Sequence, residues 1–177
     1  MTRELSLDDI KSRIRNIPDF PEPGIQFKDI TTALKQPEIF SAVVDLLAAS
    51  YTDKHISRVV CVESRGFILG GAIAAKLGAG FVPIRKPGKL PAETISATYK
   101  MEYGTNSIEI HKDAIKKDDI LLLHDDLLAT GGTVRAAVEL LKSFNPRKIY
   151  ICFFCELDFL KGRETLPDFH IRSLIHF

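Results

Sequence analysis

The sequence predicts an α/β fold in which helices flank a central, mostly parallel sheet, with an N-terminal hood and a β-hairpin flexible loop attached. First, short apolar runs alternate with helical patterns between residues 58 and 155. Strands and helices that alternate in this way form parallel sheets with crossover helices. Second, residues 95–111 show the period-2 alternation that is typical of a hairpin. Third, residues 17–29 are rich in proline and cannot continue a helix.

The composition fits one soluble domain over residues 1–177 and excludes several classes of protein. The chain is 45% hydrophobic and 27% charged, which supports a folded core and excludes disorder for most of its length. A formal net charge of +1 argues against a nucleic-acid binder. No apolar run approaches the roughly 20 residues of a membrane span, and the N-terminus lacks the apolar stretch of a secretion signal. We therefore expect a cytoplasmic protein whose three cysteines are reduced.

The N-terminal elements are two helices separated by the proline-rich stretch. Residues 6–16 have helical spacing of apolar side chains, with Ser6 as the N-cap. Residues 17–29 contain Pro18, Pro21 and Pro23. We expect this stretch to form a cap over the sheet, followed by a helix from about Pro37 to Ser50.

The middle of the chain contains the predicted sheet. Buried strands are expected at residues 58–63, 80–85, 119–124 and 148–155. Helices are expected at residues 67–78 and 131–144, the first ending at Gly78. Residues 86–93 read as a loop, and residues 95–99 and 107–111 as the two strands of the hairpin.

The strongest chemical signal lies at residues 121–137. A buried strand runs into Asp125 and Asp126, and a short turn then opens a helix. The turn consists of Ala129, Thr130, Gly131, Gly132 and Thr133. Ligands of α/β sheets bind at the carboxyl ends of strands, and a glycine-rich turn at a helix N-terminus suits a phosphate. Because carboxylates accept hydrogen bonds from vicinal diols, this combination predicts a ribose 5-phosphate site, whereas the two glycines alone would favour an ordinary capping turn.

This stretch resembles the phosphoribosyl pyrophosphate loop of type I phosphoribosyltransferases, and the form DDLLATGGT is similar to that of adenine-specific members. Further matches to the family occur in the same order at residues 18–30, 63–67, 85–91, 102–104 and 156–166. The resemblance extends from about residue 16 to the C-terminus. His124 departs from it, because the family usually has an aliphatic residue before the acids, and we expect this change to be tolerated.

The resemblance implies two groups of residues that bind the diphosphate. The first group is Glu63, Ser64, Arg65 and Gly66, and the second is the basic cluster Arg85, Lys86 and Lys89. From the residues alone, a surface ion pair and a solvated loop are the simpler interpretations. The family uses such basic residues partly from the neighbouring subunit, which implies a homodimer.

The resemblance also implies how the base is bound and protonated. The segment 1–33 corresponds to a helix and a base-binding hood, where Gln26, Phe27 and Lys28 would bind the purine. The segment 86–106 corresponds to a mobile catalytic loop, which carries Glu102 and Tyr103 at the tip of the hairpin. In the family this glutamate acts as acid and base on the purine, on a loop that closes and excludes water.

The activity implied by the resemblance is purine salvage: adenine and phosphoribosyl pyrophosphate give AMP and pyrophosphate. Glu102, Tyr103, Asp125 and Asp126 would be the catalytic residues. Mg²⁺ is implied as the cofactor, carried mainly by the diphosphate, so no set of protein metal ligands is expected. No nucleic-acid or membrane partner is expected.

Three alternatives remain open at this point. A phosphoribosyltransferase for xanthine, hypoxanthine or guanine would use the same phosphate loop, because the choice of base depends on few contacts. A regulator that senses phosphoribosyl pyrophosphate would need a DNA-binding module, for which the chain has no room. A pyrophosphokinase that makes the activated sugar would need an ATP site, which we do not find.

Overall fold

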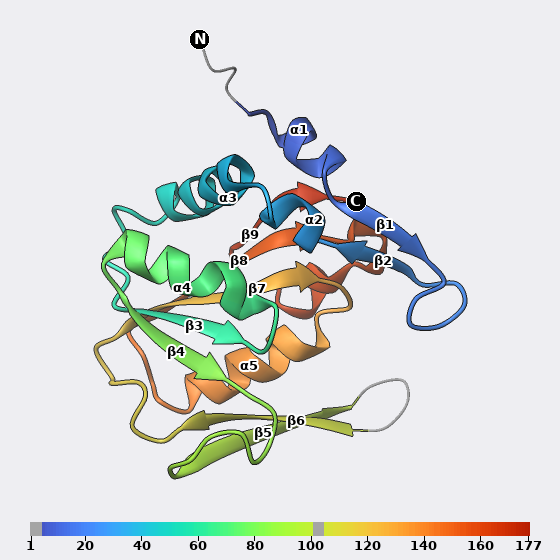
Figure 1. Cartoon of the computed structure of the whole chain (residues 1–177). Helices are drawn as coiled ribbons and strands as arrows, with labels where there is room; N and C mark the ends of the chain where they lie inside the picture. Colours follow the sequence, from blue (N-terminus) through green and yellow to red (C-terminus); the bar gives the residue numbers. More distant parts are fainter. Residues whose placement is uncertain (1–4, 101–104) are drawn as a thin grey trace. The chain divides into compact units, whose positions relative to one another are not determined.

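The computed structural model describes residues 5–100 and 105–177, and the chain divides into two compact units, Met1–Leu46 and Leu47–Phe177 (Figure 1). The first contains α1 (Leu7–Ser12), β1 (Arg15–Pro18), β2 (Gln26–Asp29), α2 (Thr31–Leu34) and most of α3 (Pro37–Ala49).

The first helix is shorter than the predicted segment 6–16. Ser6 caps it as expected, since its hydroxyl accepts a hydrogen bond from the Asp9 backbone N–H at 3.1 Å and the Asp9 carboxylate accepts one from the Ser6 N–H at 3.0 Å. The helix ends early because β1 pairs antiparallel with β2. The Arg15 guanidinium also binds the Asp29 carboxylate at 2.6 Å. Cross-strand pairing therefore overrides the helical spacing of the sequence.

A five-stranded parallel sheet forms the centre of the second unit and confirms the predicted fold class. Its strands are β3 (Arg58–Val62), β4 (Gly80–Ile84), β7 (Ile120–Leu128), β8 (Lys148–Glu156) and β9 (Ile171–His176). They lie in the order β4-β3-β7-β8-β9, and every neighbouring pair is parallel. The apolar pattern does not predict β9, because Arg172 and Ser173 interrupt its apolar residues.

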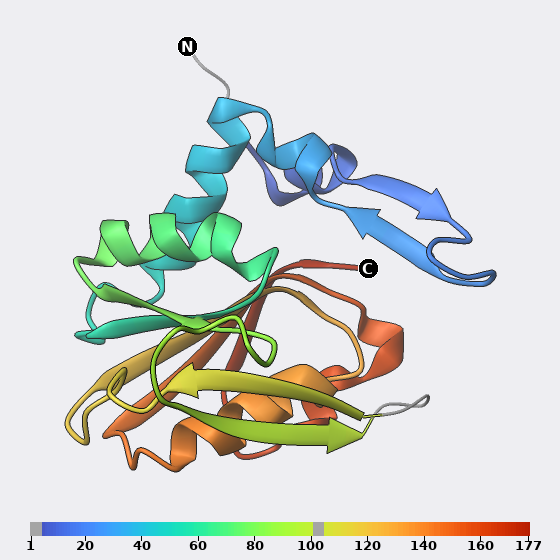
Figure 2. The ribbon, with the colours of Figure 1, turned by 60° about the horizontal axis from the view of Figure 1, so that its bottom comes forward.

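Helices α4 (Gly66–Leu77) and α5 (Gly132–Lys142) pack on opposite faces of this sheet (Figures 1 and 2). The buried residues of α5 join one continuous core with alternate residues of the central strands. On the other face, α4 approaches the sheet closely at Gly70, where a Cβ atom would lie 2.1 Å from the Cys61 Sγ atom. As predicted, α4 ends at Gly78, whose φ of 64° is left-handed.

The predicted hairpin consists of β5 (Thr94–Lys100) and β6 (Thr105–His111), which pair antiparallel and lie alongside α5 (Figure 2). Ile108 and Ile110 of β6 are buried in the same core as α5, and Ile95, Ala97 and Tyr99 of β5 pack against it. The stem of the hairpin is therefore part of the folded core, and the end of the stem at Tyr99 and Asn106 lies beside the start of α5.

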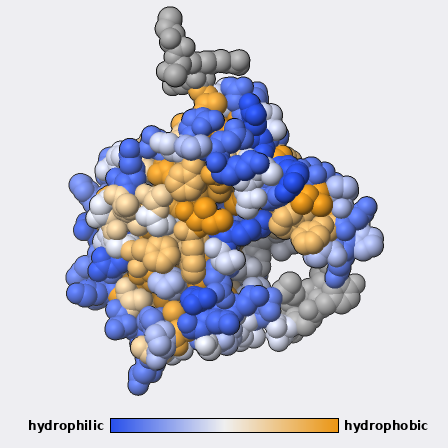
Figure 3. Space-filling model, viewed as in Figure 1, coloured by the Kyte–Doolittle hydropathy of each residue, from blue (hydrophilic) through white to orange (hydrophobic). Residues whose placement is uncertain are grey.

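An apolar patch lies on the surface around α4 (Figure 3). Ile68 of α4 is 40% exposed and Phe81 of the edge strand β4 is 41% exposed. The Phe81 ring packs edge-to-face on Phe67, with centroids 5.5 Å apart. We call Phe67, Ile68 and Phe81 the α4 patch. In the described part of the chain, no helix combines the length and apolar character needed to cross a bilayer.

His124 is buried in the middle of the sheet, directly before the acids. Its side chain is 0% exposed, and its Nδ1 atom lies 3.4 Å from the Cys152 Sγ atom of the neighbouring strand. Burial lowers the pKa of His124 from 6.5 to about 4, which a hydrogen bond to the backbone of Cys152 only partly opposes. The imidazole is therefore neutral in the folded protein at neutral pH.

We expect this histidine to make the protein sensitive to acid. Between pH 6.5 and about 4 the unfolded chain binds a proton at His124 that the folded protein does not bind. The free energy of unfolding therefore falls as the pH falls, by about 3 kcal/mol in full. His124→Val should remove this part of the pH dependence in urea titrations from pH 7 to 4. His170→Gln, at an exposed histidine, should leave the dependence unchanged, and equal slopes for His124→Val and wild type would refute the assignment.

Candidate active site

The two acids lie inside β7 rather than beyond its end. The strand was predicted to end at residue 124, but it continues to Leu128, because Leu127 and Leu128 still pair with Cys155 and Glu156 of β8. This register holds the backbone of Asp125 and Asp126 in the sheet, near its carboxyl edge.

The Asp125–Asp126 pair combines burial with one cationic neighbour. Asp126 is 4% exposed, and its Oδ2 atom lies 3.0 Å from the Arg65 Nε atom. The Asp126 backbone N–H donates to the Asp125 Oδ1 atom at 2.9 Å. Burial raises the pKa of both carboxyl groups; the Asp126 charge adds to this effect at Asp125, while Arg65 opposes it at Asp126. Hydroxyl donors that reach these oxygens would replace lost solvation, so the pair is a good acceptor for a diol.

Asp125 lies close to the loop between β3 and α4, and this closeness depends on Gly66, the first residue of α4. A Cβ atom on Gly66 would lie 2.8 Å from the Asp125 Oδ1 atom and 3.3 Å from the His124 carbonyl oxygen. A larger residue would therefore displace the acid. The absence of a side chain at Gly66 thus allows Asp125 to keep its position.

The phosphate loop, residues 129–133, joins β7 to α5. Gly131 is the N-cap of α5 with a left-handed φ of 84°, and no side chain caps the helix. The first N–H groups of a helix have no intrahelical acceptor and carry the positive end of its dipole. The loop residues and their neighbours enclose a hollow of about 80 Å³. This hollow suits a phosphate monoester.

The C-terminal segment supports the phosphate loop from behind. A Cβ atom on Gly131 would lie 2.4 Å from both the Gly162 carbonyl oxygen and the Thr165 Oγ1 atom. In the other direction, a Cβ atom on Gly162 would lie 2.2 Å from the Ala129 carbonyl oxygen. The short helix Gly162–Thr165 follows Asp158–Leu160 and is held by Arg163, whose Nε atom donates to the buried carboxylate of Glu156 at 2.7 Å. Two glycines thus allow the two backbones to touch.

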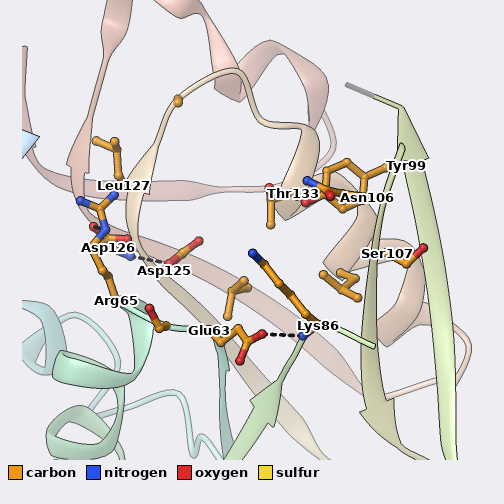
Figure 4. A pocket seen from close by; sticks show the side chains of 14 residues that line it. Glu63, Arg65, Lys86, Tyr99, Asn106, Ser107, Asp125, Asp126, Leu127 and Thr133 are labelled. Atoms are coloured by element: carbon orange, nitrogen blue, oxygen red, sulfur yellow. Dashed lines mark hydrogen bonds and ion pairs between the residues drawn. The ribbon is translucent and has the colours of Figure 1, made fainter. Parts of the chain in front are cut away.

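A cleft of about 610 Å³ lies between the carboxyl edge of the sheet and the hairpin (Figure 4). Among the predicted site residues, it is lined by Glu63, Ser64, Arg65, Lys86, Asp125, Asp126, Ala129 and Thr133. Thr130, Gly131 and Gly132 line the adjoining phosphate hollow. The structure therefore brings three of the predicted segments together around one space.

Lys86 and Arg85 have different surroundings, although they are neighbours in sequence. The Glu63 carboxylate accepts a hydrogen bond from the Arg85 Nε atom at 2.8 Å and another from the Lys86 backbone N–H at 2.7 Å. Burial raises the pKa of Glu63, but these two hydrogen bonds outweigh it and the net shift is downward. Arg85 also donates to the Lys89 carbonyl oxygen at 3.3 Å. The Lys86 side chain extends into the cleft (Figure 4), so it supplies a cation there.

The hairpin contributes cleft residues that sequence reasoning missed. Tyr99, Asn106, Ser107 and Ile108 line the cleft. Period-2 alternation along residues 95–99 puts Tyr99 on the face of Ile95 and Ala97, so the pattern held the signal for Tyr99. The proposed tip residues Glu102 and Tyr103 lie outside the described residues.

The predicted base-binding residues lie on β2 of the first unit. Gln26 accepts a hydrogen bond from the Asn16 side-chain amide at 2.7 Å, and the Lys28 Nζ atom donates to the Asn16 Oδ1 atom at 3.0 Å. The Phe27 ring packs edge-to-face on Phe20 with centroids 5.1 Å apart. Polar groups thus flank an aromatic ring on one short hairpin.

An acid pair near the carboxyl end of a strand, a hollow at a helix N-terminus and a cation across the cleft suit a protein that binds a phosphorylated sugar. A family model described as "Phosphoribosyl transferase domain" matches residues 30–175, so the chain belongs to the phosphoribosyltransferase family.

Relatives and solved structures specify the kind of phosphoribosyltransferase that the chain resembles. It is 56% identical to an adenine phosphoribosyltransferase of Geobacter metallireducens over 171 residues, which cover 97% of this chain and 100% of the relative. It is 55% identical to the enzyme of that name from Phocaeicola vulgatus, over 93% of this chain and 94% of the relative. The crystal structure of adenine phosphoribosyltransferase from Thermoanaerobacter pseudethanolicus superposes with a TM-score of 0.94 at 48% identity, covering 97% of this chain and 100% of that chain.

Proposed function

We propose that the protein transfers the 5-phosphoribosyl group of phosphoribosyl pyrophosphate to N9 of adenine, giving AMP and pyrophosphate in purine salvage. This is a pentosyl transfer. The observation that carries the proposal is the single cleft in which the acid pair, the phosphate loop and Lys86 converge.

The choice of adenine is supported by the relatives. A Giardia lamblia structure, described as a complex with 9-deazaadenine, superposes with a TM-score of 0.93 at 44% identity and covers 98% of this chain and 99% of that chain. A Saccharomyces cerevisiae structure is described as a complex with adenine and an imino-altritol bisphosphate. It superposes with a TM-score of 0.90 at 38% identity and covers 95% of this chain and 97% of that chain. Both are adenine phosphoribosyltransferases by name.

The reaction breaks the bond between ribose C1 and the diphosphate oxygen and forms a bond between C1 and N9. The electron pair leaves with the diphosphate, and C1 gains oxocarbenium character. Asp125 and Asp126 accept hydrogen bonds from the ribose hydroxyls while the phosphate loop holds the 5-phosphate, so C1 is fixed against the base. Glu102 takes the N9 proton of adenine, with Tyr103 beside it in sequence.

Cations of the chain stabilise the departing diphosphate. Lys86 extends into the cleft from one side, and Arg65 lines it at the acid pair. Arg85 and Lys89 hold the loop that carries Lys86, while Ser64 and Gly66 let the diphosphate approach the backbone. A preorganised cation at a site where negative charge develops lowers the barrier.

Mg²⁺ fits this site as a cofactor that arrives with the substrate. The cleft offers the carboxylate oxygens of Asp125, which suit a hard cation. Asp126 is already paired with Arg65 at 3.0 Å, so a full set of protein ligands is not available there. When bound, the metal supplies charge neutralisation for the diphosphate.

Residues 1–33 of the first unit are proposed to form a hood that binds the base. Phe27 offers a flat face for stacking a purine, and Gln26 and Lys28 flank it on β2. Main-chain groups at these positions would read the edge of adenine.

We further propose that the protein is a cytoplasmic homodimer that pairs through the α4 patch. The patch combines Ile68 and Phe81, two large apolar residues that are 40% and 41% exposed, with an aromatic pair at an edge strand. Such a patch is typical of an interface between subunits. It adjoins the strand that leads into Arg85 and Lys86, so the partner lies near the diphosphate site.

A panel of bases tests the proposed function. The protein is incubated with phosphoribosyl pyrophosphate, Mg²⁺ and one base at a time, and pyrophosphate release is measured. We expect release with adenine at a kcat/KM at least about 100-fold above that for hypoxanthine, guanine or xanthine, because a base that mismatches a hydrogen-bonding site leaves buried polar groups unpaired. Equal turnover of several bases would contradict the adenine assignment, and no turnover with any base would contradict transfer itself.

A further inference from the structure

One hydrogen bond links the hairpin to the phosphate loop. The Tyr99 hydroxyl of β5 lies 3.1 Å from the Thr133 Oγ1 atom in the first turn of α5 (Figure 4). Both residues line the cleft, although they are far apart in the sequence. Thr133 belongs to the phosphate loop, whereas Tyr99 lies on β5 and has no role assigned to it in the proposed function.

The position of Tyr99 is fixed by packing and does not depend on its hydroxyl group. Tyr99 lies on the inward face of β5 with Ile95 and Ala97, and it packs against the core that contains α5. The ring lies beside Gly132, where a Cβ atom would make an ordinary van der Waals contact with the Tyr99 Cδ2 atom at 3.8 Å. A phenylalanine at this position can keep the same contacts.

A bound anion would fix the orientation of the Tyr99 and Thr133 hydroxyl groups, because it can only accept hydrogen bonds. A phosphate oxygen only accepts hydrogen bonds, so Thr133 must donate its single proton to it. The Thr133 oxygen then has lone pairs free to accept, and the Tyr99 hydroxyl lies within reach to donate. The chain of donors runs in one direction, from Tyr99 to Thr133 to the phosphate, and such chains are mutually strengthening.

We propose that Tyr99 is a positioning residue for the 5-phosphate: its hydroxyl holds the Thr133 hydroxyl in the orientation that donates to the sugar phosphate. The proposal rests on the proposed function for the identity of the anion. It adds to the phosphate loop a residue that the loop sequence does not contain.

The effect should appear in substrate binding and not in the chemical step. The 5-phosphate does not react, so the interaction is equally strong in the ground state and in the transition state. Tyr99→Phe should therefore raise the KM for phosphoribosyl pyrophosphate about 3- to 10-fold, the usual range for one hydrogen bond, and leave kcat within about twofold. The KM for adenine should not change.

The experiment measures both turnover and direct binding. Ribose 5-phosphate is titrated by calorimetry into wild type, Tyr99→Phe, Thr133→Ala and the double variant. We expect Tyr99→Phe to weaken binding about 3- to 10-fold in the wild-type background and to have no further effect in the Thr133→Ala background. Thr98→Val is the matched control, because it removes a neighbouring hydroxyl that bonds across the hairpin to Ser107 at 2.8 Å. It should bind ribose 5-phosphate as wild type does.

The proposal would be overturned by unchanged affinity in Tyr99→Phe, by an equal loss with and without Thr133, or by a fall in kcat at constant KM. A loss in Thr98→Val as large as that in Tyr99→Phe would indicate a general loosening of the hairpin and would also overturn it. The calorimetric measurement of ribose 5-phosphate binding tests the role of Tyr99 independently of the transfer reaction. A wild-type protein that binds ribose 5-phosphate but turns over no base refutes the transfer reaction while the Tyr99 comparison still stands.

Discussion

Asp126→Asn is expected to lower kcat/KM for phosphoribosyl pyrophosphate by about 100- to 1000-fold, the range found when a preorganised polar group is removed from a reacting centre. The amide has the shape of the carboxylate but no charge and only one acceptor oxygen, so it holds the ribose diol poorly. The measurement is steady-state kinetics of pyrophosphate release at saturating adenine.

The same variant should keep its thermal stability. The raised pKa of Asp126 means that its ionised form costs folding free energy at neutral pH, because burial disfavours the charge more than Arg65 favours it. Removing the charge should therefore leave the Tm unchanged or raise it, and Arg65, which is partly exposed, can regain water. Glu139→Gln, an exposed carboxylate on α5, is the control and should change neither quantity. Activity near the wild-type level in Asp126→Asn would show that the acid does not hold the sugar.

Gly131→Ala is expected to damage both stability and sugar-phosphate binding. The left-handed φ of 84° is unfavourable for alanine, and the added Cβ atom would meet the Gly162 carbonyl oxygen at 2.4 Å. The backbone conformation alone costs about 1 kcal/mol, and the clash with backbone atoms brings the loss of unfolding free energy to at least about 2 kcal/mol. The phosphate loop must then move, so the affinity for ribose 5-phosphate should fall at least about 10-fold.

The control for this variant is Gly71→Ala. Gly71 lies in α4, and a Cβ atom there would meet nothing within 4 Å. Alanine at an open helical position stabilises by about 0.5–1 kcal/mol. In urea denaturation, the free energy of unfolding should thus fall in Gly131→Ala and rise in Gly71→Ala. In calorimetry, only Gly131→Ala should bind ribose 5-phosphate more weakly. Equal behaviour of both variants would show that the phosphate loop can relax away from the C-terminal segment.

The parts of the site that were predictable from sequence are those encoded by local chemistry. The phosphate loop needs glycines and hydroxyls in consecutive positions, and the acids follow an apolar strand, so residues 125–133 could be found in one stretch. The family match at residues 30–175 confirms that this reading led to the right class of protein. Gly78 could likewise be assigned to the end of a helix from its place after an apolar pattern.

The parts that could not be predicted depend on partners distant in the chain. The extension of β7 to Leu128 follows from its pairing with β8, which local propensity does not contain. The end of α1 at Ser12 depends on the pairing of β1 with β2 in the same way. Tyr99 reaches the cleft only because the hairpin packs alongside α5. Gln26, Phe27 and Lys28 remain predictions as base-binding residues.

The mutual contact of Gly131 and Gly162 has a practical consequence for protein engineering. The anion-binding turn cannot be transferred alone, because its backbone conformation depends on contact with residues 162–165. Arg163 binds this segment to Glu156. Grafting residues 125–133 onto another scaffold should fail unless the downstream segment travels with them. For the same reason, libraries that diversify the two stretches together should yield more working variants than libraries that diversify either one alone.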